Sequence, residues 1–162
     1  MSPKLSKVKI GLPWGIGEVE FEPNDAQRTA AWKLYVELMT RISIQPLGES
    51  EGFLREALSS LHQLFGVTRD ILKEAGPDVG AAKNSVGGIA MIVLNNALRP
   101  VLSKWHPLLE DWENKRAAGV SQIAHERDWP DGKQLRVQLD ALRGELSKYA
   151  DGLAQIAGVD GA

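Results

Sequence analysis

Cysteine is absent from the 162 residues of the chain. This excludes disulfide bonds, thiol catalysis and zinc sites with thiolate ligands, and it is compatible with a reducing compartment such as the cytoplasm. Histidine occurs only three times, at His62, His106 and His125. No two of them have the three- or four-residue spacing of a helical zinc site. We therefore expect neither a metal nor a cofactor.

The net charge is also small, with a formal value of −2. Such a balance gives no general attraction to nucleic acid. The N-terminal residues lack the continuous apolar core of a signal peptide. The most apolar run, residues 86–102, contains Asn95, Asn96 and Arg99 and is too polar for a typical transmembrane span. We expect a cytoplasmic protein that binds neither nucleic acid nor a membrane.

Catalytic motifs are likewise missing: the sequence has no phosphate-binding loop and no serine in a nucleophile elbow. No catalytic residue is therefore assigned. Hydrophobic residues make up 43% and charged residues 25%, which is typical of a soluble globular protein. The length suits a single domain over residues 1–162.

Residues 5–22 predict a β-hairpin. Leu5, Val8 and Ile10 alternate with polar residues, a Gly/Pro-rich turn follows, and Val19 and Phe21 alternate again. An isolated hairpin is marginally stable in water, so this one should pack on the rest of the protein.

Residues 24–158 predict four helices with apolar stripes. Asn24 is expected to cap the first helix, and Gln27 to complete a capping box with it. The expected helices span residues 26–44, 50–75, 87–112 and about 132–158, with a flexible loop at 78–88. The short connections favour a mostly α fold, an up-down four-helix bundle with the N-terminal hairpin packed on it.

The third helix has an a/d heptad seam, made of Gly87, Met91, Leu94, Leu98, Val101, Trp105, Leu108 and Trp112. Pro100 and Pro107 both lie off this seam, which favours a bent helix with its prolines toward solvent. The alternative is a break before Pro107. Residues 89–94 are apolar nearly all round, so their outer side should be covered by the hairpin or by a second subunit, and we favour the hairpin.

Arg99, Lys104 and His106, with Asn95 and Asn96, form the best candidate ligand site. Arg99 and His106 lie two turns apart on one side of the third helix, where they could hold an anion. The alternative is an ordinary solvated or ion-paired helix face. The polar residues His125 to Asp128 are interpreted as a charge and cap arrangement before the fourth helix.

Five tryptophans are many for this length. Trp105 and Trp112 belong to the seam, and Trp32 is expected in the core. Trp14 at the hairpin tip and Trp129 before the last helix are candidate interface residues, because exposed aromatic residues often anchor partners. Either could instead attach its loop to the helices.

The stretches "LRPVLSKWHPLLEDWE", "GEVEFEPNDAQRTAAWKLYVELMTRISIQPL" and "LREALSSLHQLFGVTRDIL" resemble a family of small bacterial helical proteins with no established activity. The resemblance spans residues 10–158 and implies a bacterial, cytosolic setting, with a weaker association with accessory, conflict-related or antiviral-defence systems.

Taken with the missing catalytic motifs, these observations favour a non-enzymatic adaptor whose partner is another protein or a second copy of the chain. The alternative is a small-ligand or nucleotide sensor, or an enzyme subunit, that uses the polar cluster around Arg99, Lys104 and His106.

Overall fold

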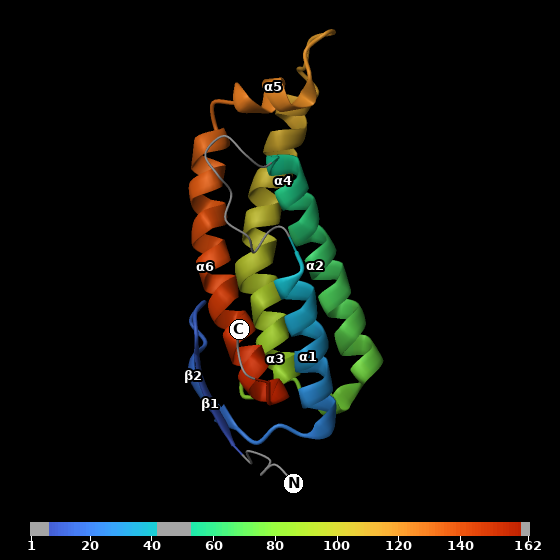
Figure 1. Ribbon diagram of the computed structural model, residues 1–162, viewed down its shortest axis with the longest axis vertical. Coiled ribbons are helices and arrows are strands. Elements are labelled where there is room, and N and C mark those ends of the chain that lie inside the picture. The colour runs from blue at the N-terminus through green and yellow to red at the C-terminus, as the bar shows by residue number, and fades with distance from the viewer. Residues whose placement is uncertain (1–6, 42–52, 160–162) are drawn as a thin grey trace.

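The protein is mostly helical, with an N-terminal two-stranded antiparallel hairpin (Figure 1). The computed structural model describes residues 7–41 and 53–159. The elements are β1 (Val8–Leu12), β2 (Gly17–Phe21), α1 (Asp25–Met39), α2 (Leu54–Ala75), the 3₁₀ turn η2 (Pro77–Val79), α3 (Val86–Ile92), the π-helical segment η3 (Val93–Leu98), α4 (Arg99–Glu113), α5 (Gln122–Arg127) and α6 (Gly132–Ala157). In Figure 1 the long helices run along the long axis, and α5 crosses their upper end.

The hairpin has the register that the apolar alternation predicts. Ile10 pairs with Val19 and Val8 pairs with Phe21, and all four side chains are buried on the same face of the sheet. Leu5 lies outside the described residues. Because side chains alternate strictly between the two faces of a strand, a shift of one residue would expose the whole apolar set. The register is therefore fixed by burial.

The hairpin packs on α6, and not on residues 89–94 as we expected. A Cβ atom built on Gly152 of α6 would lie 3.3 Å from Cδ1 of Ile10 and 3.4 Å from Cδ2 of Leu12. The physical reason is that small residues on the last turns of α6, Ala150 and Gly152, let the strand approach the helix closely. The preference for the hairpin as the cover of residues 89–94 was therefore wrong. α3 contacts α1 and η2 instead.

Asn24 caps α1 as predicted, since its Oδ1 accepts a hydrogen bond from the Gln27 N–H at 2.8 Å. Gln27 has a different role from the expected one. Its side chain is buried, and its Oε1 accepts from the backbone N–H of Val86 at 3.0 Å. Gln27 thus satisfies a donor in the first turn of α3, which would otherwise be a buried N–H without a partner.

The expected flexible loop at 78–88 is closely packed around the start of α3. Ser85 is buried, and its hydroxyl accepts from the Gly88 N–H at 3.1 Å and donates to the Ala82 carbonyl at 2.6 Å. Gly80, with a φ of +83°, lies against Ser85. The two glycines at the start of α3 reflect tight backbone packing, because a Cβ on Gly87 or Gly88 would lie 1.9 or 1.8 Å from a carbonyl oxygen of the loop.

The third helix continues from Val86 to Glu113, but the π-helical segment η3 interrupts its seam. A π turn has a longer hydrogen-bonded ring than an α turn and so shifts the face that later residues present. Leu108, a seam residue that follows η3, is accordingly 43% exposed, and Met91, a seam residue that precedes η3, is 40% exposed. The buried series runs instead through Ile89, Ala90, Val93, Leu94, Ala97, Leu98, Trp105 and Leu109.

Both prolines are exposed, as predicted, and α4 runs through Pro107 without a break. Pro100 is the second residue after η3. In a regular α-helix its ring would crowd the carbonyl of Asn96, and the wider turn relieves that contact. The Val86–Glu113 helix is long and apolar enough to cross a membrane by length and composition, and half of its most apolar window is buried inside the protein.

Candidate functional site

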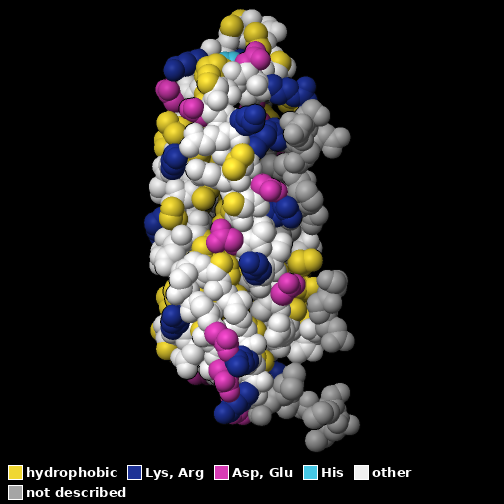
Figure 2. Space-filling model, turned by 90° about the vertical axis from the view of Figure 1, so that its left-hand side faces the viewer, with side chains coloured by type: hydrophobic (Ala, Val, Ile, Leu, Met, Phe, Trp, Pro, Cys, Tyr) yellow, Lys and Arg dark blue, Asp and Glu magenta, His cyan; other side chains and the backbone are white. Residues whose placement is uncertain are grey.

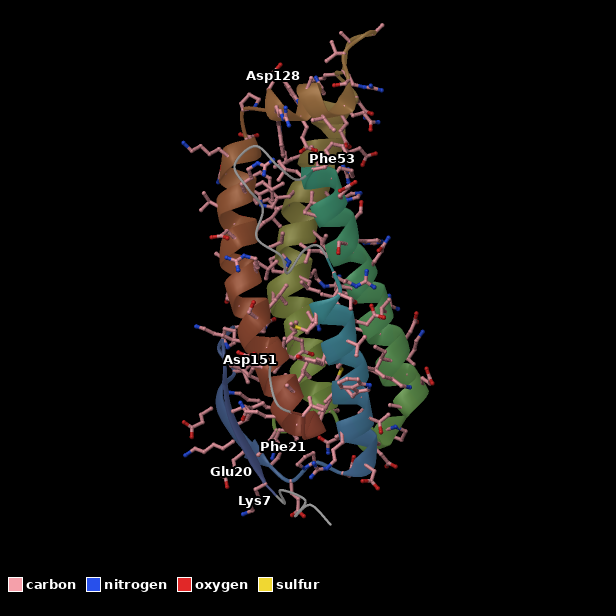
Figure 3. All side chains as sticks on the ribbon, in the orientation of Figure 1. Lys7, Glu20, Phe21, Phe53, Asp128 and Asp151 are labelled. Carbon is pink, nitrogen blue, oxygen red and sulfur yellow. The ribbon has the colours of Figure 1, made fainter. Side chains whose placement is uncertain are left out.

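The upper end of the molecule brings together polar residues from α2, α4, α5 and the start of α6. In Figure 3 the labels Phe53 and Asp128 mark this end, the first just before α2 and the second just after α5. Glu126 of α5 is 6% exposed, and its carboxylate reaches the first turn of α2. It accepts from the Leu54 N–H at 2.7 Å and from the Arg55 N–H at 3.2 Å. A buried carboxylate therefore caps a helix that begins about 70 residues earlier in the chain.

Opposing effects act on the protonation of Glu126. Burial raises the pKa of its carboxyl above the ordinary value, and the charge of Glu113 adds to the rise. The two backbone N–H groups and the charge of Arg136 lower the pKa, and the net shift is upward. The sequence interpretation placed this residue in a cap before α6, but the structure places it at the start of α2.

Arg55 joins α2 to α4 at the same end. Its Nη2 and Nε donate to the two carboxylate oxygens of Glu113 at 2.6 and 3.0 Å, which is a bidentate ion pair. Its Nη1 lies 3.1 Å from Nδ1 of His106. Because a guanidinium group only donates, Nδ1 accepts and the ring proton is on Nε2. The ring of His106 also stacks on His62, with centroids 6.4 Å apart.

His125 and Trp112 hold α5 against the end of α4. Their rings are stacked at 4.4 Å with an angle of 6° between them. The Trp112 indole N–H donates to the His125 carbonyl at 2.8 Å, and Nε2 of His125 donates to the Trp112 carbonyl at 2.6 Å. The Trp112 indole N–H and Nε2 of His125 are both used within the pair, which fixes the orientation of the two rings.

An open pocket of about 440 Å³ lies beside this cluster, lined by Phe53, Arg55, Glu113, Asn114, Arg116, Gln122, His125 and Glu126. Its acidic residues are both engaged, Glu113 by Arg55 and Glu126 by the backbone of α2. Among the described residues, no group of three or more His, Asp or Glu could hold a metal ion. The contacts of the cluster fasten the ends of α2, α4 and α5 together.

The predicted cluster on the third helix is divided among separate contacts. Arg99 donates to Oδ1 of Asn95 at 3.3 Å, and its guanidinium lies over the Phe65 ring at 5.1 Å. Lys104 lies over the ring of Trp105 at 4.7 Å. Arg99 and His106 do lie on one side of the helix, as predicted, and that side faces α2, but His106 belongs to the Arg55 cluster. Each predicted residue thus has its own intramolecular partner.

The two candidate interface tryptophans differ in exposure. Trp129 is 6% exposed, and its ring meets that of Trp105 edge to face at 5.9 Å, so it attaches its loop to the helices. Its prediction as an interface residue was wrong, because the core between α4 and α6 has room for its ring. Trp14 is half-buried and meets Tyr149 of α6 edge to face at 6.0 Å.

Sequence reasoning missed an exposed apolar face on α1. Trp32, expected in the core, is 47% exposed, and Val36 and Met39 are 38% and 39% exposed. The half-buried Tyr35 stacks on Trp32 with centroids 5.9 Å apart. Their spacing of three and four residues was visible in the sequence. However, Ala30, Ala31, Leu34 and Leu38 supply a second stripe on the same helix, and these smaller side chains are the buried ones.

No family model, curated protein or solved structure matches this chain.

The resemblance drawn from the sequence motifs stays a prediction.

Glu126→Gln is expected to change how folding stability depends on pH. The pKa of Glu126 is higher in the folded protein than its ordinary value of 4.5. The wild type therefore gains free energy of unfolding as pH falls through the folded pKa, and the gain is complete below the unfolded value. The glutamine variant lacks this gain. Urea denaturation at several pH values between about 7 and 4 should show the wild type gaining stability relative to the variant.

If the two proteins keep a constant difference in unfolding free energy over that range, Glu126 does not titrate differently in the two states. A matched control is Glu110→Gln, since Glu110 is exposed at the same end of the protein. Its difference from the wild type should not vary in this way.

Proposed function

We propose that this protein is a non-enzymatic interaction module built on an up-down four-helix bundle, and that the exposed face of α1 binds another protein. We call Trp32, Tyr35, Val36 and Met39 the α1 face. The observation that carries the proposal is the exposure of Trp32, Val36 and Met39. The half-buried Tyr35 stacks on Trp32. Large aromatic residues contribute most of the binding energy at many protein interfaces.

The bundle reading is supported by the path of the chain. In Figure 1, α1 and the α3–η3–α4 helix run upward, whereas α2 and α6 run downward. Neighbouring contacts join α1 with both α2 and α6, and α2 with α4. Such a scaffold holds α1 rigidly and presents its outer side to solvent.

The charged residues beside the α1 face favour its use as a protein–protein interface. Lys33 pairs with Glu74 of α2 at 3.3 Å, and Arg41 pairs with Glu37 at 2.7 Å. These paired charges form a polar border on one side of the apolar residues. An apolar centre with a polar rim is the usual anatomy of a protein–protein interface.

The size of the face favours a transient partner over a stable dimer. From Trp32 to Met39 the helix rises only about 10 Å at 1.5 Å per residue. Stable interfaces bury roughly 800 Å² on each partner, which two helical turns do not provide. We therefore propose that the partner is a different protein and that it binds through a short segment with an apolar face, such as an amphipathic helix.

Trp32→Ala is expected to weaken binding of that partner by about 30-fold, the effect of losing roughly 2 kcal/mol at a central aromatic residue. The partner would be captured in the native host through a photo-crosslinking amino acid at position 36, and then purified for titration. Position 137 is the matched control, since Val137 is 65% exposed and belongs to the second turn of α6, which begins near the upper end of the molecule, whereas α1 lies in the lower half (Figure 1).

Equal crosslinking at positions 36 and 137 would contradict the proposal, as would unchanged affinity of the Trp32→Ala variant for the purified partner. An adduct with the mass of two copies of this chain would instead identify self-association.

The sensor alternative is not favoured by a specific observation. It needs Arg99, Lys104 and His106 to converge on one ligand, whereas each is engaged by a different aromatic or charged group.

A further inference from the structure

A small pocket lies between the hairpin tip, η3, α4 and α6, and none of its lining residues belongs to α1. It has a volume of about 270 Å³. Its lining comprises Trp14, Asn96, Ala97, Pro100, Val101, Gln138, Ala141, Leu142 and Glu145. Pockets for drug-sized ligands occupy roughly 300–1,000 Å³, so this one suits a smaller group such as one side chain or a short amine.

Trp14, which lines the pocket, has an energetically unfavourable backbone conformation. Its φ is +62°, the only positive value for a non-glycine residue in the part of the chain that the structure describes. Gly15 is also at positive φ, and the Ile16 N–H donates to the Pro13 carbonyl at 3.3 Å to close the turn. Asn-Gly is the usual sequence for such a turn, and a bulky residue there is strained.

Contacts of the Trp14 side chain must therefore offset the free-energy cost of this backbone conformation. One contact is the edge-to-face meeting with Tyr149, which attaches the tip to α6. Ile16, two residues after Trp14, is 2% exposed, and its burial also attaches the hairpin tip to the rest of the protein. These contacts leave Trp14 half-buried and forming one wall of the pocket. An indole ring that is already ordered is suited to binding, because little side-chain entropy is lost.

Glu145 supplies the charge of the pocket. It is half-buried on α6, and within the described residues no ion pair engages its carboxylate. Of the nearby cations, Arg143 pairs with Asp140 at 2.9 Å and Lys104 lies over Trp105, whereas Lys148, one turn along α6 from Glu145, is exposed and does not line the pocket. No Lys or Arg is among the lining residues. The field in the pocket therefore favours a positive group.

Trp14, Glu145 and the apolar floor together define the chemistry of a ligand. A carboxylate beside an indole ring attracts an organic cation, which gains both a charge interaction and a cation–π contact. Ala97, Val101 and Leu142 suit an aliphatic stem attached to that cation. A metal ion is less suitable, since the lining contains a single carboxylate and Oε1 of Gln138 already accepts from the Trp105 indole at 2.7 Å.

We propose that the pocket between Trp14 and Glu145 binds an alkylammonium group, the side chain of a lysine in a peptide or a free aliphatic amine. This pocket shares no lining residue with the α1 face. Figure 2 views the α6 and hairpin side of the molecule, where charged side chains of both signs alternate with hydrophobic ones. A lysine of a partner would find both kinds of contact there.

The test is a titration followed through the ¹⁵N–¹H signal of the Trp14 indole, assigned by comparison with Trp14→Phe. The probes are Nα-acetyl-lysinamide, its Nε-acetylated neutral form, butylamine, and an acetylated pentapeptide with one central lysine. We expect saturable shifts with the cationic probes, and at least about fivefold weaker binding by Glu145→Gln. Glu110→Gln, an exposed glutamate on α4, is the matched control and should bind as the wild type does.

Equal binding of the neutral probe, unchanged affinity in Glu145→Gln, or no shift up to about 20 mM probe, beyond the weakest affinity of practical interest, would overturn the proposal. Among supporting results, tighter binding of the pentapeptide than of butylamine assigns the pocket to a partner's lysine. The opposite order assigns it to a free amine. Circular dichroism of each variant checks that the fold is unchanged, and loss of the α1 face by Trp32→Ala should not alter the titration.

Discussion

Gly88→Ala is expected to lower the free energy of unfolding by about 3 kcal/mol or more, which is at the upper end for overpacking because the new atom meets backbone. A Cβ atom on Gly88 would lie 1.8 Å from the Ala82 carbonyl oxygen and 2.4 Å from its carbon. Neither atom belongs to a flexible side chain. The loop would have to move away from α3.

That movement would also break the cap of α3. The Ser85 hydroxyl donates to the Ala82 carbonyl and accepts from the Gly88 N–H, so both of its bonds lie at the point of the clash. Removal of a helix cap of this kind costs about 1 kcal/mol. The variant therefore loses both packing and capping at one position.

Gly66→Ala is the matched control for the same change in a different environment. Gly66 lies inside α2, and a Cβ there would meet nothing within 4 Å. Alanine should stabilise this helix by about 0.5–1 kcal/mol. Urea denaturation of the three proteins measures both effects. If Gly88→Ala leaves the midpoint unchanged or raises it, the close approach of the loop to α3 is contradicted.

The elements that depend on local pattern were predictable from the sequence. The hairpin register follows from strict alternation around a Gly/Pro turn, and the cap of α1 follows from Asn24. α2 and α6 follow from continuous apolar stripes. In each case the residues that determine the element lie within a few positions of one another.

The phase of the third helix was not predictable in the same way. A heptad count assumes one constant period, and η3 changes that period between Val93 and Leu98. The count therefore placed Leu108, which follows η3, on the buried face, although this residue is exposed. Pro100 was the available signal, since a proline disturbs the turn that precedes it.

Long-range side-chain roles were the least predictable part of the candidate sites. Gln27 bonds α3 and Glu126 bonds α2, and in both cases the partner is more than fifty residues away in the sequence. The same holds for Arg55 and Glu113. A polar residue near a helix start indicates a cap, but which helix it caps depends on the tertiary fold. Arg99 and His106 were placed correctly on one side, yet their partners come from α2.

Trp105→Ala is expected to lower the free energy of unfolding by about 3–5 kcal/mol, the usual cost of removing a large aromatic residue from a core. Trp105 is 1% exposed and lies at the junction of α4, α6 and the segment before α6. Its indole N–H donates to Oε1 of Gln138 at 2.7 Å, and its ring meets Trp129 edge to face.

The loss should extend beyond the cavity. Trp129 would lose the ring against which it packs, and the segment it attaches connects α5, with the Glu126 cap, to α6. We therefore expect the Trp105→Ala variant to show weaker hydrogen-exchange protection at the first amides of α2 as well as lower overall stability. Trp105→Phe should fall between the two proteins, because it keeps most of the ring but leaves the Gln138 oxygen without its donor.

Leu108→Ala is the control for this prediction, since Leu108 lies on the same helix and is 43% exposed. It should change stability by less than about 0.5 kcal/mol, as surface substitutions usually do. Chemical denaturation followed by circular dichroism compares the variants without relying on tryptophan fluorescence. If Trp105→Ala and Leu108→Ala had equal effects, the helix would present another face to the core. The phase shift that we attribute to η3 would then be wrong, because it is that shift which turns Leu108 outward while Trp105 stays buried.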